Sequence, residues 1–138
     1  MGYNTDSVEW PRGTYIPEPV KRLIDRFYNL LDDDDSGVGS ILADEIFTLD
    51  GVAYFGGQPF KGTDGEGAER VLRVYVADTD ASDLLFIASV TMGLRNGKQV
   101  EGEFAGRLLI ADATGSNPRL RLYQVWGDSS ALMKALQP

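Results

Sequence analysis

The chain has 138 residues, of which 43% are hydrophobic, so it can bury one core in a single domain, and this composition disfavours wholesale disorder. Its formal net charge of −8, from 21 acidic and 13 basic residues without a basic cluster, disfavours nucleic acid as a partner. Because it contains no cysteine and no histidine, disulfides, thiolate nucleophiles, histidine-based triads and most transition-metal sites are also excluded.

Hydrophobic spacing and turn residues divide the chain into a flexible N-terminal arm and one domain. After Pro17 and Pro19, apolar residues recur at intervals of three and four up to Leu31, as in an amphipathic helix. Three long stretches alternate as strands do, and Asn96-Gly97 between the first two is a strong hairpin signal. The predicted elements are an arm at 1–16 and, within a domain at 17–138, a helix at 17–32, a short helix around 41–42, short strands at 46–49 and 52–55 joined by Asp50-Gly51, a helix at 65–76, long strands at 84–94, 99–111 and 119–126, and a helix at 129–136.

Strand alternation sorts the side chains of the three long strands onto two faces. One face mixes glutamate and arginine, and we interpret its Glu103 and Arg107 as members of a cross-strand ion-pair ladder. The other face is almost wholly apolar, with Gln124 as its clearest polar member, and is expected to line a pocket unless it is plain core. The apolar residues predicted to contact a ligand there are Phe86, Val90, Met92, Phe104, Leu122 and Trp126.

The N-terminus, MGYNTD, lacks the basic and apolar regions of a secretory signal. No stretch of the chain approaches the ~20 apolar residues that span a bilayer. We therefore expect a cytoplasmic protein without a membrane partner.

The acidic run that begins at Asp32 resembles the opening of a calcium-binding EF-hand loop, with Gly37 at the sharp turn. However, Gly39 stands at the position that is normally apolar, and Ala43 stands where the loop needs a bidentate glutamate. A solvated helix end is the preferred interpretation, and we expect no bound metal.

Three stretches carry a family resemblance. Residues 42–50, LADEIFTLD, resemble a run of the ketosteroid isomerases that ends in their general base. Residues 60–64, FKGTD, resemble the step before the third helix of the NTF2-like superfamily, and residues 123–128, YQVWGD, resemble the closing strand of its SnoaL-like branch. The resemblance covers residues 17–136 and implies an α+β fold, in which a curved antiparallel sheet wraps around three helices and forms a conical apolar pocket.

Carried over residue by residue, the resemblance places Asp50 at the position of the isomerase base. Beside an apolar pocket its pKa would rise and make it a proton shuttle, whereas in a turn its side chain would bond to its own backbone. Gly106 falls where those isomerases have the acid of their oxyanion hole. Phe27 falls at the position of their tyrosine, with Tyr28 beside it. These departures disfavour steroid isomerisation by that machinery.

The resemblance therefore implies a small cofactor-free enzyme of secondary metabolite biosynthesis, of a kind found especially in fungi. It would be an isomerase or cyclase acting on a bulky apolar natural-product intermediate, in which Asp50 moves a proton and Tyr28, Tyr54 or Gln124 polarises a carbonyl. Relatives usually form homodimers through the outer sheet face, which implies the same here. The alternatives are a non-catalytic module for ligand binding or dimerisation, and a polyketide dehydratase.

Overall fold

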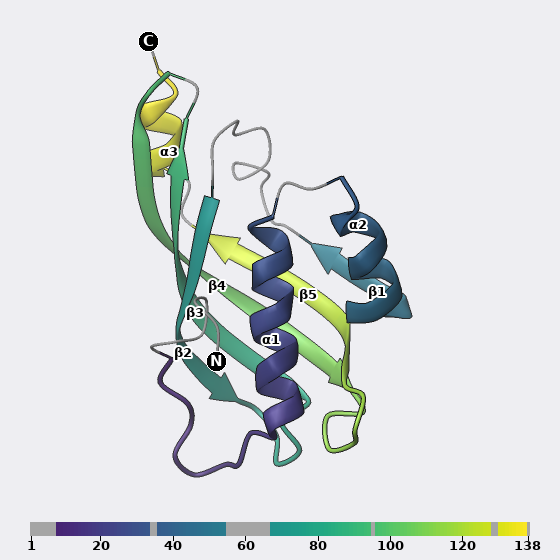
Figure 1. The fold of residues 1–138 in the computed structure, drawn as a ribbon. Coiled ribbons are helices and arrows are strands. Elements are labelled where there is room, and N and C mark those ends of the chain that lie inside the picture. Colours follow the sequence, from purple (N-terminus) through teal and green to yellow (C-terminus); the bar gives the residue numbers. More distant parts are fainter. Residues whose placement is uncertain (1–7, 34–35, 55–66, 95, 128–129, 138) are drawn as a thin grey trace.

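The structure is a computed structural model and describes residues 8–33, 36–54, 67–94, 96–127 and 130–137, with the backbone alone at 67–69, 92 and 132. The motif at 60–64 lies outside these residues. The chain forms an α+β fold (Figure 1). In chain order its elements are α1 (Glu18–Leu31), α2 (Val38–Ile41), the π-helical turn η2 (Leu42–Ile46), β1 (Phe47–Tyr54), β2 (Gly67–Val76), β3 (Asp83–Gly93), β4 (Gln99–Ala111), β5 (Arg119–Gly127) and α3 (Ser130–Ala135).

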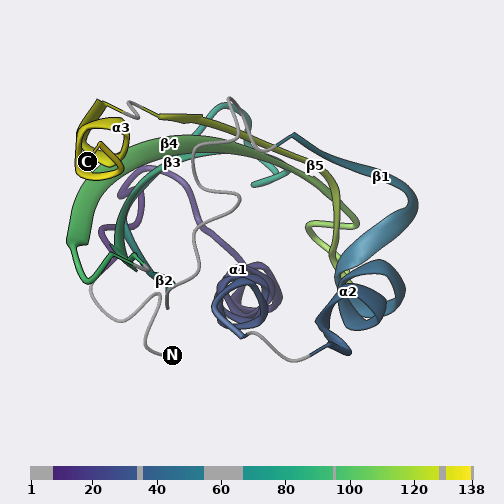
Figure 2. The same ribbon diagram turned by 90° about the horizontal axis from the view of Figure 1, so that it is seen from above.

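One five-stranded sheet, in the order β1-β5-β4-β3-β2, forms the body of the fold. Neighbouring strands from β2 to β5 are antiparallel, whereas β1 pairs in parallel with β5. The sheet is therefore mixed, and the expectation of a wholly antiparallel sheet is wrong at this edge. Viewed from above, the strands curve around α1, which lies on their concave side (Figure 2).

Helix α1 confirms the first predicted helix. Pro17 is its N-cap residue and Pro19 lies in its first turn, where the missing backbone donor costs nothing. Its apolar stripe is buried against the sheet, with Val20, Ile24, Phe27 and Tyr28 at most 1% exposed. At the other end of the chain, α3 confirms the predicted terminal helix and bonds to the β3–β4 hairpin through Asn96, whose amide donates to the Ala135 carbonyl over 2.9 Å. No helix in the described part of the chain is long and apolar enough to cross a membrane.

The helix predicted at 65–76 is wrong, because its described residues form the edge strand β2. The prediction rested on the 3–4 residue spacing of Ala68, Leu72 and Tyr75. In the structure, Val71 pairs with Ala88 and Arg73 with Ile87, so one extra residue is inserted into β2 between them. The bulge breaks the alternation of β2 and leaves the buried valines at 71 and 74 three positions apart, whereas Tyr75, on the predicted helical face, is 45% exposed.

Of the two predicted hairpin signals, one is confirmed and one is wrong. Gly97 has φ +83° and its N–H donates to the Leu94 carbonyl over 3.0 Å, which makes the tight β3–β4 turn. Asp50-Gly51 instead lies inside the single strand β1. A Cβ on Gly51 would press on the Phe47 side chain and the Leu120 carbonyl, so this glycine permits a close approach of the two strands.

Candidate functional site

A cluster of aromatic side chains fills the concave side of the sheet beneath α1. Tyr28 from α1 and Tyr123 from β5 face each other, with their hydroxyl oxygens 3.2 Å apart, and are 0% and 2% exposed. The Phe27 ring packs edge-on to Tyr123 with 4.7 Å between centroids, and the Phe86 ring stacks on Tyr123 at 6.1 Å. Phe104 packs edge-on to Phe86 at 5.8 Å. These contacts fix both hydroxyls inside an apolar environment.

The two hydroxyls stand out because of their surroundings. Among the described residues that are fully buried, Tyr28 and Tyr123 carry the only polar side-chain groups. A buried hydroxyl needs a hydrogen-bond partner, and here one of the two hydroxyls donates to the other across the interior. Each phenol is both a donor and an acceptor, so the pair can polarise a carbonyl oxygen placed beside it.

A bulge in β5 places Tyr123 in the interior. Ile110 pairs with Leu120 and Leu109 with Leu122, so Arg121 is the extra residue on β5. Because side chains alternate along a strand, one inserted residue turns every later side chain to the opposite face. Tyr123 and Val125 therefore face inward, where the uninterrupted alternation had placed their neighbours.

The sequence predicted that Leu122, Gln124 and Trp126, the neighbours of Tyr123 and Val125, would line the pocket. For these three residues the predicted face is wrong. Leu122 and Gln124 are half-buried and Trp126 is 49% exposed, all three on the outer, convex face of the sheet. Gln124 pairs with Arg107 of β4 and with Tyr54 of β1, and Tyr54 is 54% exposed. Tyr54 and Gln124 therefore lie on the opposite side of the sheet from Tyr28.

Residues predicted on β3 and β4 do face the interior. Phe86, Val90 and Phe104 are between 1% and 7% exposed and belong to the core. The Met92 side chain lies outside the described atoms. Gly106 also faces inward, and a Cβ there would collide with the Phe86 ring. In this chain that ring occupies the space that an acid at position 106 would need.

Asp50 is exposed on β1, where it accepts a 2.9 Å hydrogen bond from the Thr48 hydroxyl. Its neighbour Leu49 is fully exposed as well. The structure therefore places Asp50 in a polar, solvent-facing setting, without the apolar surroundings on which the predicted proton-shuttle role depends. That role stays a prediction.

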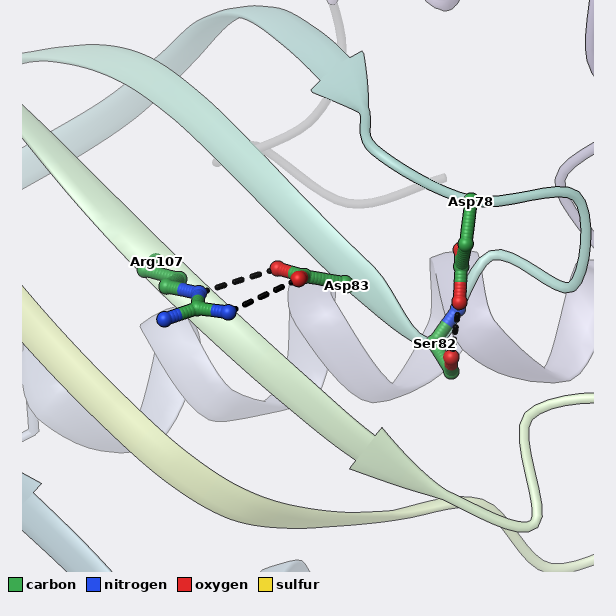
Figure 3. Close-up of polar contacts among 4 residues, drawn as sticks. All are labelled: Asp78, Ser82, Asp83 and Arg107. Atoms are coloured by element: carbon green, nitrogen blue, oxygen red, sulfur yellow. Dashed lines mark hydrogen bonds and ion pairs between the residues drawn. The ribbon is translucent and has the colours of Figure 1, made fainter.

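Arg107 forms an ion pair on the outer face, as expected for that face, with Asp83 as its partner (Figure 3). Its Nε and Nη2 donate to the two carboxylate oxygens over 3.0 and 2.8 Å. These hydrogen bonds lower the pKa of Asp83 below its usual value, outweighing the opposite effect of its partial burial. Nearby, Asp78 accepts bonds from the Ser82 N–H and hydroxyl and shapes the β2–β3 turn.

The uninterrupted alternation that places Gln124 on the apolar face places its neighbour Tyr123 on the polar face, so the sequence prediction missed half of the hydroxyl pair. The available signal was chemical: Leu122-Tyr123 offers two large side chains in succession, and only one of them can face inward. In the described ranges no group of three or more acidic residues is placed to hold a metal ion, and residues 34–35 of the acidic run lie outside those ranges.

Comparison with solved structures identifies the architecture. A SnoaL-like polyketide cyclase from Jannaschia sp. CCS1 superposes with a TM-score of 0.65 over 91% of this chain and 97% of its own, at 14% identity. PrhC from Penicillium brasilianum gives 0.66 over 88% and 90%, at 16% identity. The chain has the NTF2-like fold.

A third solved structure also superposes on this chain. TerC, co-crystallised with polyporic acid, superposes with a TM-score of 0.62 over 85% of this chain and 97% of its own, at 11% identity. No protein-family model matches the sequence, and a search of curated protein sequences finds no significant match. The resemblance to NTF2-like and SnoaL-like proteins that the sequence indicated is confirmed at the level of the fold.

Proposed function

We propose that this protein is a cofactor-independent isomerase or cyclase, in which a bulky apolar, carbonyl-bearing intermediate displaces part of the aromatic packing on the concave side of the sheet. The Tyr28–Tyr123 hydroxyl pair is the observation that carries the proposal, since it is a polar pair in an otherwise apolar interior. The fold shared with a SnoaL-like polyketide cyclase supports the same reaction class.

In this proposal the tyrosine pair stabilises the negative charge that develops on the substrate. One phenol accepts a hydrogen bond from the other. Because hydrogen bonds in series polarise one another, the accepting phenol's own hydroxyl proton then becomes more positive. Donation to a carbonyl oxygen stabilises the negative charge that develops there during enolisation, while the proton that leaves the adjacent carbon passes to water. Phe86, Val90 and Phe104 supply apolar surface that selects one conformer of the substrate.

The exposure of Asp50 favours a second candidate function. Without a base buried beside the tyrosines, the same interior would bind an apolar ligand and leave its covalent structure unchanged. The two functions differ at one point, which is whether a bound substrate exchanges a proton.

Binding of a carbonyl-bearing aromatic probe tests the proposed site. Polyporic acid is a suitable probe, because a protein of the same fold was crystallised with it. We expect Tyr28→Phe to weaken binding about 5- to 10-fold in calorimetric titrations, the value of one buried hydrogen bond. Tyr75→Phe, an exposed tyrosine of the outer face, is the matched control and should leave the affinity unchanged. Equal affinities for all three proteins would remove the tyrosine pair from the site.

The outer sheet face supports a further part of the proposal, a homodimer. Val52, Tyr54, Leu85 and Trp126 are between 41% and 54% exposed on β1, β3 and β5, which is a large apolar area for a surface facing water. We expect Trp126→Glu to shift the sedimentation equilibrium from dimer to monomer, while Met133→Glu on α3 does not. Weak dimers form at protein concentrations on the order of 100 micromolar. If the wild-type protein is still a monomer at that concentration, the proposed dimer is wrong.

A further inference from the structure

The segment that precedes α1 borders an open hollow on the protein surface. It has a volume of about 350 Å³ and is lined by residues 10–16 together with Lys21 of α1. Pockets of roughly 300–1,000 Å³ are the size that holds a small ligand. Lys21 lies in the first turns of α1, and Tyr28 follows seven residues later, which is about 10 Å along the helix axis. The hollow is therefore separate from the tyrosine pair.

This segment is held at both ends, so that the hollow has fixed walls. At one end, the Glu9 N–H donates to the Leu72 carbonyl over 2.9 Å and its carbonyl accepts from Val74 N–H over 3.0 Å. The Glu9 carboxylate also pairs with Arg73 at 2.7 Å. At the other end, Ile16 is buried in the core at 3% exposure. A loop tied at both ends loses less conformational entropy when it binds a ligand.

The charge of the lining is opposite to that of the whole protein. Arg12 and Lys21 line the hollow and no carboxylate does, although the chain carries a net charge of −8. Within the described ranges Arg12 forms no hydrogen bond or ion pair, and Lys21 has a single acidic neighbour, Glu18, at 3.8 Å, which is beyond hydrogen-bonding distance. Arg12 is therefore available to an anion, and Lys21 is paired only with an exposed carboxylate.

The aromatic residues of the lining add a second element of recognition. The Lys21 ammonium lies 4.9 Å from the centre of the Trp10 ring, which positions the charge beside a flat apolar surface. Tyr15 is 76% exposed and borders the same hollow. Cations beside flat rings match a ligand that is both planar and negatively charged.

We propose that the hollow lined by Trp10, Arg12, Tyr15 and Lys21 is a binding site for a small planar aromatic carboxylate. The carboxylate contacts the guanidinium of Arg12 and the ammonium of Lys21, and the ring packs against Trp10. This site is independent of the function proposed for the interior, and either one can stand without the other.

The two tryptophans of the chain allow a direct test. In a Trp126→Phe background, Trp10 is the only tryptophan, so its fluorescence reports on this hollow alone. The protein is titrated with 2-naphthoate and, in parallel, with the neutral ketone 2-acetonaphthone. We expect saturable quenching by naphthoate, at least 10-fold weaker binding of the ketone, and weaker naphthoate binding at 1 M salt than at 0.05 M, since salt screens the charge attraction.

Three further variants in the same background locate the ligand. Arg12→Gln should weaken naphthoate binding at least 5-fold, whereas Arg22→Gln, an exposed arginine on α1 that does not line the hollow, should change it less than 2-fold. Tyr28→Phe should also leave it unchanged. Linear, unsaturated quenching, equal loss in the two arginine variants, or a loss confined to Tyr28→Phe would each overturn the proposal.

Discussion

Gly106 offers the sharpest test of how the interior is packed. A Cβ at this position would lie within contact distance of three atoms of the Phe86 ring, two of them much too close. The ring cannot easily yield, because Tyr28, Phe104 and Tyr123 surround it at centroid distances of 5.6, 5.8 and 6.1 Å. We therefore expect Gly106→Ala to cost about 3 kcal/mol, the upper part of the usual range for overpacking, and to lower the Tm by about 10 °C.

Gly102→Ala is the matched control for this substitution. Gly102 lies on the same face of β4, yet a Cβ there would meet nothing within 4 Å. We expect its free energy of unfolding to stay within about 0.5 kcal/mol of the wild type or to rise slightly, because alanine restricts the unfolded chain. Urea denaturation followed by circular dichroism measures both variants.

A double-mutant cycle then assigns the cost of Gly106→Ala to one contact. In a Phe86→Leu background the flexible leucine can turn away, so Gly106→Ala should cost under about 1 kcal/mol, which leaves a coupling of about 2 kcal/mol between the two positions. Additive effects of the two substitutions, or equal stabilities for Gly106→Ala and Gly102→Ala, would refute this packing.

Three further predictions follow from single side chains. Asp83→Asn should lose about 0.2–1 kcal/mol of stability at pH 7. Because the hydrogen bonds from Arg107 lower the pKa of Asp83 in the folded protein, the pair stabilises the fold above the ordinary aspartate pKa, and this contribution is lost as the pH falls through the lowered pKa. In a urea series at decreasing pH, the stability difference between the two proteins should therefore shrink. Val125→Ser should cost about 2–3 kcal/mol and Trp126→Ser under about 1 kcal/mol, because the bulge turns only the former inward; the reverse order by urea denaturation would place the bulge elsewhere. Asp50→Asn should leave turnover of a substrate within about 2-fold if its exposed position is retained during the reaction, and a loss of 100-fold or more would restore it as the general base.

The elements of this fold were predictable wherever the hydrophobic period was regular. Helix α1 was predicted from an unbroken apolar stripe, and β4 from thirteen residues that alternate without interruption. The β3–β4 turn was predicted because Asn96-Gly97 has a backbone preference of its own, which needs no tertiary contact.

The two largest errors have one physical cause. A bulge at Leu72 breaks the strand alternation of β2, and a bulge at Arg121 exchanges the two faces of β5. A bulge is set by how two strands pair, and nothing in the alternation of either strand marks the inserted residue. This is why Tyr123 was missed while Tyr28, on a regular helix, was among the predicted residues.

The position of Asp50 shows a similar limit. Asp50-Gly51 has the composition of a hairpin turn, but the chain continues as one strand, because Gly51 lets β1 approach the Leu120 carbonyl of β5. A parallel pairing between strands far apart in the sequence leaves no local signal.

Tyrosine-selective NMR tests most directly the claim that the concave interior is the ligand site. Four of the six tyrosines lie on described elements, with Tyr28 and Tyr123 in the interior and Tyr54 and Tyr75 on the outer face, while Tyr15 borders the N-terminal hollow. On titration with polyporic acid, the ring resonances of Tyr28 and Tyr123 should shift together and saturate, with those of Tyr54 and Tyr75 unmoved. Shifts confined to the outer-face tyrosines or to Tyr15 would contradict the claim.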